Sequence, residues 1–138
     1  MRSQLQRTPS VEPRSLRLPR GRAYDPYAHA EALGLQVIFK PITRDELVLP
    51  PKYRTIVVCS EIREVHQRNA LAHGIAHWEL GHPDDRPKYE HQADRYAAMY
   101  LIHPGELRAA CRWTDDPALI AQELLVTRRL LEAYLNRA

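Results

Sequence analysis

Short extended runs alternate with longer helical patterns along the chain after about residue 25. Two runs rich in β-branched residues, 35–39 and 55–59, predict strands. A third run, 47–49, is a candidate for a short edge strand, because two prolines follow it and proline cannot donate to a sheet. We expect these three segments to form one small antiparallel sheet.

Apolar residues at helical spacing, together with start and stop residues, predict the helices. Asp25-Pro26 begins the first, since Asp accepts from the free amides of a first turn and Pro fits position N1. Gly34 and Gly81 stand where the left-handed residue that ends a helix belongs. Thr127 can cap a second helix inside the last pattern. The predicted helices are 27–33, 63–80, 88–102 and 118–136, with 106–112 as a turn or a short helix.

The composition is that of a globular domain. A chain of 138 residues, 44% hydrophobic and 27% charged, fits one domain with a core. No stretch approaches the roughly 18 apolar residues that span a bilayer, and the N-terminus lacks the apolar segment of a secretory signal. Two cysteines make no disulfide framework. We therefore expect a reduced, cytoplasmic protein without a membrane partner.

The positive charge is concentrated at the N-terminus. Residues 1–22 contain six arginines and one acidic residue, Glu12, so they carry +5 and leave the rest of the chain at −2 within a total of +3. Three prolines and the lack of apolar periodicity predict that 1–22 is a disordered basic tail before a folded domain over 23–138. Such a tail can contact nucleic acid or an acidic partner, or can simply aid solubility.

The candidate chemistry lies in two neighbouring helical segments. His73 and His77 are four residues apart, so they share one face of a helix that turns about 100° per residue. Glu90 follows 13 residues after His77, and Asp94 shares its face in the next helix. Two imidazoles and one carboxylate supply three corners of a tetrahedral zinc site. We predict zinc on His73, His77 and Glu90, with Asp94 supporting a ligand histidine.

The residue that usually activates water is missing from this pattern. In H-E-x-x-H peptidases the general base follows the first histidine directly, and here that position is Gly74. Helical spacing puts Glu79 on the far face as a solvated carboxylate, and His82 is also expected to face away. His66 is a weaker candidate on a similar face, while the remaining histidines, His29 among them, are expected on the surface or in loops.

These segments resemble a known family, the ImmA/IrrE-type zinc metallopeptidases. The run from Leu71 to His82 is similar to its "LAHELGHxxLGH" core, and the run from Glu90 to Pro104 to its "ExEADRFAAxLLMP" segment. The opening helix and strand and the C-terminal helix pair also fit, so the likeness covers about 25–135. It implies a compact, zincin-like α+β domain in which a small sheet packs beside a metal-bearing helix pair and C-terminal helices close the fold.

The resemblance also implies a function. Such proteins are commonly encoded in phages and bacterial stress regulons, and often act on a helix-turn-helix repressor. The general base does not carry over, because Gly74 has no carboxylate. We therefore expect a regulatory protein with weak or lost peptide hydrolysis. One alternative is an inert zinc-containing module that binds a protein. A weaker alternative is DNA binding through the tail and the helix pair at Val126-Thr127, although that pair lacks a glycine at its turn.

Overall fold

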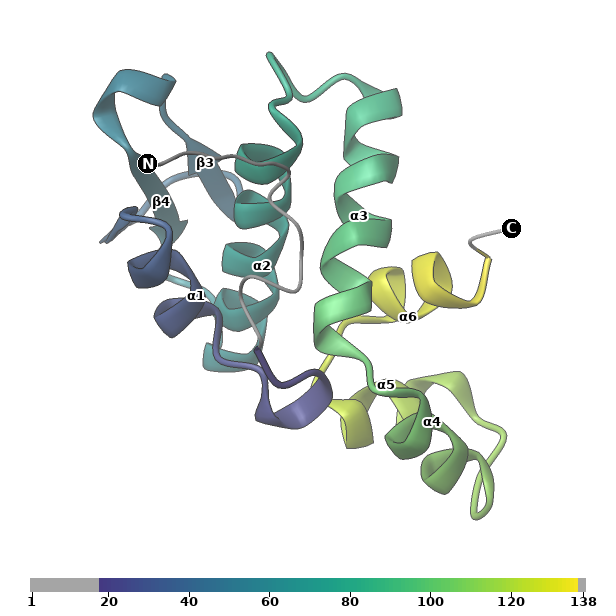
Figure 1. Cartoon of the computed structure of the whole chain (residues 1–138). Coiled ribbons are helices and arrows are strands. Elements are labelled where there is room, and N and C mark those ends of the chain that lie inside the picture. Colours follow the sequence, from purple (N-terminus) through teal and green to yellow (C-terminus); the bar gives the residue numbers. More distant parts are fainter. Residues whose placement is uncertain (1–17, 137–138) are drawn as a thin grey trace, which may run out of the picture.

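Helices and strands occupy separate layers in the computed structural model, which describes residues 18–136. In chain order the elements are η2 (Gly21–Ala23), α1 (Pro26–Ala32), β2 (Gln36–Lys40), β3 (Glu46–Val48), η3 (Pro51–Tyr53), β4 (Thr55–Cys59), α2 (Glu64–Leu80), α3 (Pro87–Leu101), α4 (Pro104–Cys111), α5 (Pro117–Leu124) and α6 (Arg128–Leu135). Helix α2 packs on β3 and β4 on one side and on α3 on the other, and α6 packs on α3 (Figure 1). The predicted α+β class is confirmed.

The sheet is mixed, which differs from the antiparallel sheet that we expected. Its order is β2-β4-β3, with β4 parallel to β2 and antiparallel to β3. All five residues of β4 are buried, so this strand takes the centre, and the two more exposed strands take the edges. The chain passes from β2 to β3 at the far edge and returns to the middle with β4. The parallel pair follows from that order.

Helices α2 and α3 approach each other through small side chains. Helix α2 ends at Gly81, whose φ of 68° is the left-handed conformation that glycine adopts without a steric penalty. Pro87 then occupies the first position of α3. Between the two helices, Ala76, Ala93 and Ala97 are fully buried at 0% exposure. Because interaxial distance depends on the side chains at the contact, these alanines bring the two helices close together.

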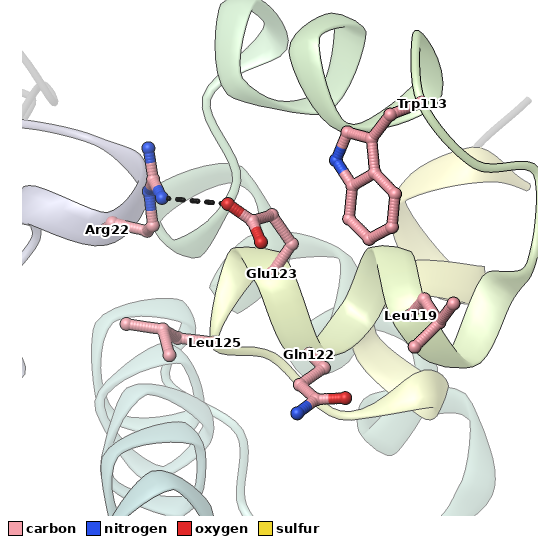
Figure 2. A pocket seen from close by; sticks show the side chains of 6 residues that line it. All are labelled: Arg22, Trp113, Leu119, Gln122, Glu123 and Leu125. Carbon is pink, nitrogen blue, oxygen red and sulfur yellow. Dashed lines mark hydrogen bonds and ion pairs between the residues drawn. The ribbon is translucent and has the colours of Figure 1, made fainter.

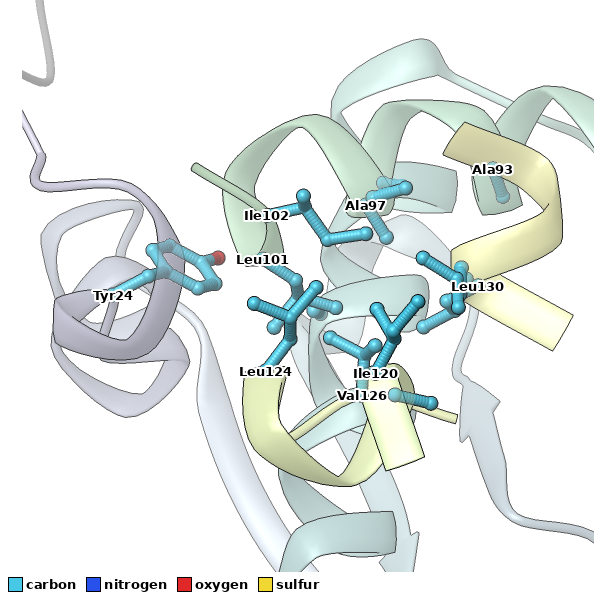
Figure 3. Packing of buried hydrophobic residues seen from close by; sticks show 14 of the residues in the cluster. Tyr24, Ala93, Ala97, Leu101, Ile102, Ile120, Leu124, Val126 and Leu130 are labelled. Atoms are coloured by element: carbon cyan, nitrogen blue, oxygen red, sulfur yellow. The ribbon is translucent and has the colours of Figure 1, made fainter. Parts of the chain in front are cut away.

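The C-terminal helices close the larger of two hydrophobic clusters. Leu124 of α5 and Leu130 of α6 pack there against Leu101 at the end of α3 (Figure 3). Thr127 caps α6, as predicted, by accepting a hydrogen bond from the amide of Leu130 at 3.2 Å. The smaller cluster lies between α1, the sheet and α2 and contains Ile56. Among residues 18–136, no helix is both long and apolar enough to cross a membrane.

The folded part starts earlier than predicted. Arg20 donates to the carbonyls of Met99 and Ile102 at 2.6 and 3.0 Å, and Gly21 is buried. Arg68 of α2 also donates to the Gly21 carbonyl at 2.8 Å. The expected boundary between residues 22 and 23 therefore falls inside the folded part. The rest of the predicted tail, residues 1–17, lies outside the described residues.

Candidate metal centre

The two histidines of α2 lie side by side in the protein interior. His73 and His77 are 3% and 7% exposed, and their ring centroids are 4.7 Å apart in a stacked arrangement. The pairing follows from their spacing on the helix, and the burial follows from the continuous buried run 69–77 in α2. The two histidines therefore lie on one face of α2, as their spacing predicted.

Glu90 reaches both histidines from α3. Its Oε1 atom lies 2.9 Å from His73 Nε2 and 2.8 Å from His77 Nε2. His77 makes a hydrogen bond with this oxygen, whereas His73 Nε2 is buried and makes none. The 2.9 Å approach to His73 is therefore close but lies off the ring N–H direction. One carboxylate oxygen and two imidazole nitrogens thus converge on one point, and one of the nitrogens is left without a partner.

Asp94, which we predicted to support a ligand histidine, lies close to His73. It is 7% exposed, and its Oδ1 lies 3.8 Å from His73 Nδ1 without making a hydrogen bond. Arg129 of α6 holds the other oxygen, with its Nε atom 3.3 Å from Oδ2. Burial raises the pKa of Asp94, and the nearby guanidinium opposes that rise. Helix α6 thereby places a positive charge beside Asp94, and Nη2 of Arg129 also donates a hydrogen bond of 3.3 Å to His73 Nδ1.

A fourth residue, Glu46 of β3, joins this centre and was missed from the sequence. Its donor atom lies within 4.8 Å of those of His73 and His77, and its Oε2 is 3.8 Å from His73 Nδ1. Glu46 is only 6% exposed. Burial, followed by the negative charge of Glu90, raises the pKa of Glu46 to about 8. The sequence contained little indication of this, because the predicted strand began at Leu47. The alternation expected for that strand would also have turned Glu46 toward solvent.

Gly74 lies where Glu46 enters the centre. A Cβ atom at position 74 would lie 3.4 Å from Glu46 Cγ and 3.1 Å from Ile56 Cγ2. The second distance is shorter than ordinary carbon contacts of about 3.5–4.0 Å. The absence of a side chain at position 74 therefore lets α2 lie close to the sheet and leaves room for the side chain of Glu46.

His82 contacts the centre, so the expectation that it faces away is wrong. Its Nδ1 atom lies 2.8 Å from His77 Nδ1, and its Nε2 lies 2.8 Å from Gln92 Oε1. The expectation extended helical periodicity to residue 82, but the helix ends at Leu80, and the left-handed Gly81 turns the chain back. His82 is thus placed to fix the orientation of the His77 ring.

Two further expectations fail on the opposite face of α2. Glu79 does lie away from the metal residues, but its side chain is 11% exposed rather than solvated, and it accepts a hydrogen bond from Tyr96 at 2.9 Å. His29 is fully buried rather than on the surface, with Tyr24 Oη 2.7 Å from its Nδ1. Helix α1 covers this face of α2, and sequence periodicity carried no sign of that packing.

The residues present fit a divalent cation. Burial lowers the pKa of His73, which keeps the imidazole neutral as metal binding requires. His73 Nε2 is buried without a hydrogen bond, and Glu90 Oε1 lies 2.9 Å from it. Glu46 and Glu90 bring negative charges together, and a cation between them would offset their repulsion. Glu90, at 37% side-chain exposure, leaves the centre open toward solvent.

A cavity of about 730 Å³ opens beside the centre, between β3 and the end of α2. It is lined by Glu46 and Leu47 of β3 and by His77 and His82. In this three-stranded sheet β3 is an edge strand, so backbone groups along one side have no strand partner among the described residues. An extended peptide can pair with such an edge.

A second hollow lies far from this chemistry, between η2 and the C-terminal helices. Trp113 and Leu119 line it, and an ion pair of 3.3 Å joins Arg22 to Glu123 at its side (Figure 2). None of the predicted metal residues lines this hollow. The cavity beside β3, in contrast, is lined by His77, one of the predicted metal residues.

The chain matches a known protein family over most of its length. Residues 30–136 match the family model for the IrrE N-terminal-like domain, Peptidase_M78. The chain belongs to this family. The predicted ImmA/IrrE resemblance is thereby confirmed, and with it the metallopeptidase-like character of the domain. The comparison with curated proteins found no match.

The family assignment and the geometry support each other. The IrrE N-terminal-like domain includes both helices of the centre, the sheet and α6, so every residue described around His73 lies inside the matched range. Glu46, His73 and His77 form a buried cluster that could hold a metal ion, which is consistent with a metallopeptidase-like domain. In this IrrE-like chain the glycine at position 74 is accompanied by a carboxylate delivered from the sheet.

Proposed function

We propose that this protein is a zinc-dependent cytoplasmic regulator that binds an extended segment of a protein target, such as a helix-turn-helix repressor, and hydrolyses it weakly. The observation that carries the proposal is the convergence of His73, His77 and Glu90 on one point beside an open cavity. Two imidazoles with one carboxylate are a common catalytic zinc set.

Each residue has a defined part in this proposal. His73, His77 and Glu90 would hold the ion, Asp94 would support His73 electrostatically from 3.8 Å, and His82 would orient His77. Zinc, when bound, polarises a peptide carbonyl and lowers the pKa of water toward about 7. The weak hydrolysis follows from Gly74, since losing a general base typically costs about 10²–10⁴-fold.

The target is proposed to be a protein on two grounds. The exposed edge of β3 borders the cavity, and strand addition at such an edge recognises extended polypeptide. Beyond the first 22 residues the chain has a net charge of −2, which does not favour a phosphate backbone. Helices α5 and α6, the alternative DNA-binding pair, bury Leu124 and Leu130 in the core.

A chelator-sensitive cleavage assay tests the proposal. The purified protein is incubated with the product of the neighbouring gene, with and without EDTA, and fragments are identified by mass spectrometry. We expect slow cleavage that EDTA and His77→Ala abolish and that His91→Ala, an exposed histidine on α3, leaves unchanged. Binding without any cleavage would favour the alternative of an inert zinc-containing binding module.

A further inference from the structure

Strand β3 buries a charged residue and exposes an apolar one, which is the reverse of the usual pattern. Side chains alternate between the two faces of a strand, so a half-buried strand normally turns its apolar residues inward. Here Glu46 is 6% exposed, whereas the neighbouring Leu47 is 37% exposed. A carboxylate therefore points into the protein and a leucine points toward solvent. Local conflicts of this kind are expected mainly at functional sites.

The inward carboxylate has no partner that explains its burial. Within residues 18–136, the side chain of Glu46 makes no hydrogen bond, and its ion-pair contact is His73 Nδ1 at 3.8 Å. A buried carboxylate without a hydrogen bond is costly, and the more distant charges of Arg44 and Arg129 do not outweigh the effect of burial on Glu46. Its environment is instead the cavity beside the centre and the two histidines.

The side chain of Glu46 passes close to residue 74, the position of the general base in H-E-x-x-H peptidases. Glu46 Cγ lies 3.4 Å from the place of a Cβ at residue 74, so the carboxylate that follows it enters the space beside the first histidine. A glutamate on the helix at position 74 would fill that same space, which is why glycine at 74 and glutamate at 46 are sterically complementary. Glu46 also lines the cavity in which a substrate would lie.

We propose that Glu46 is the general base of this centre and supplies from strand β3 the carboxylate that position 74 lacks. This inference rests on the proposed function, and it accounts for weak rather than absent hydrolysis. In the proposed step the oxygen of water forms a bond to the peptide carbonyl carbon while one water proton passes to the Glu46 carboxylate. Glu46 then returns that proton to the leaving nitrogen as the C–N bond breaks. The products are a carboxylic acid and an amine, and the carboxylate of Glu46 is regenerated.

Acetohydroxamic acid is a suitable probe, because it chelates a metal through two oxygens and needs a nearby acceptor for its acidic proton. The full chain is loaded with Co²⁺, and acetohydroxamic acid is titrated by visible absorption. We expect Glu46→Gln to lower the affinity for acetohydroxamic acid by about 10- to 100-fold, which corresponds to the loss of one charge-assisted hydrogen bond. Glu64→Gln, an exposed carboxylate at the start of α2, should leave the affinity unchanged.

Metal content separates this inference from the proposed function. Zinc analysis should show one ion per chain in the parent and in Glu46→Gln. Loss of zinc in Glu46→Gln alone would make Glu46 a ligand and overturn the inference. Unchanged affinity for acetohydroxamic acid in Glu46→Gln would also overturn it, because Glu46 would then only protect the edge of the sheet. A parent without zinc would overturn the proposed function itself. If Glu46→Gln does not fold, Glu46→Asp, which keeps the charge but is one methylene shorter, should retain zinc and also bind the probe more weakly.

Discussion

Replacing Gly74 with alanine tests the close approach of α2 to the sheet. Alanine in a helix interior is favoured over glycine by about 1 kcal/mol, so an unhindered site would gain stability. At this site the new Cβ would lie 3.1 Å from Cγ2 of Ile56, which is fully buried on the central strand and cannot easily move. Overpacking of this kind costs about 1–3 kcal/mol. The two effects predict that Gly74→Ala is destabilising by up to about 2 kcal/mol.

Gly74→Ala made in variants of Ile56 tests directly whether the Ile56 side chain causes the destabilisation. Ile56→Ala removes the obstructing methyl group at a cost of about 2–5 kcal/mol, and in that background Gly74→Ala should stabilise the protein by about 1 kcal/mol. Ile56→Val, which keeps Cγ2, should give no such reversal. Urea unfolding followed by circular dichroism measures all the variants. The same effect of Gly74→Ala in the parent and in Ile56→Ala would refute the steric argument.

Three further predictions address the surroundings of the centre. His82→Ala should weaken zinc binding by about 10–100-fold in a competition titration with a chelator, because the ring of His77 loses its orienting partner. Asn69→Ala should lower the free energy of unfolding by about 1–3 kcal/mol in urea, since the buried amide bonds the Leu125 carbonyl at 3.0 Å. Deleting residues 1–17 should leave the thermal midpoint nearly unchanged, whereas deleting 1–22 should lower it by several degrees, because the contacts of Arg20 are lost.

Local signals in the sequence were sufficient for the elements. Asp25, Gly81 and Thr127 each act at helix ends through a local interaction, so their predicted roles appear in the structure. The strand 55–59 was predicted at its observed bounds, because four of its five residues are β-branched. The pairing of His73 with His77 also depends only on helical geometry.

Features that depend on packing between distant elements were not predictable in this way. The position of Glu46 follows from the docking of β3 against α2 at Gly74, a contact between residues far apart in the chain. The burial of His29 follows from the docking of α1. His82 was misplaced because helical periodicity was applied two residues past the end of the helix. In each case the missing information was tertiary rather than local.

Metal content of the purified full chain is the most direct test of the central claim that His73, His77 and Glu90 hold a zinc ion. Inductively coupled plasma mass spectrometry should find one zinc per chain in the parent and in the exposed-site control His91→Ala. It should find almost none in His73→Ala or His77→Ala, with circular dichroism confirming that both variants fold. Full zinc occupancy in both histidine variants, or a parent that takes up no zinc, would contradict the account.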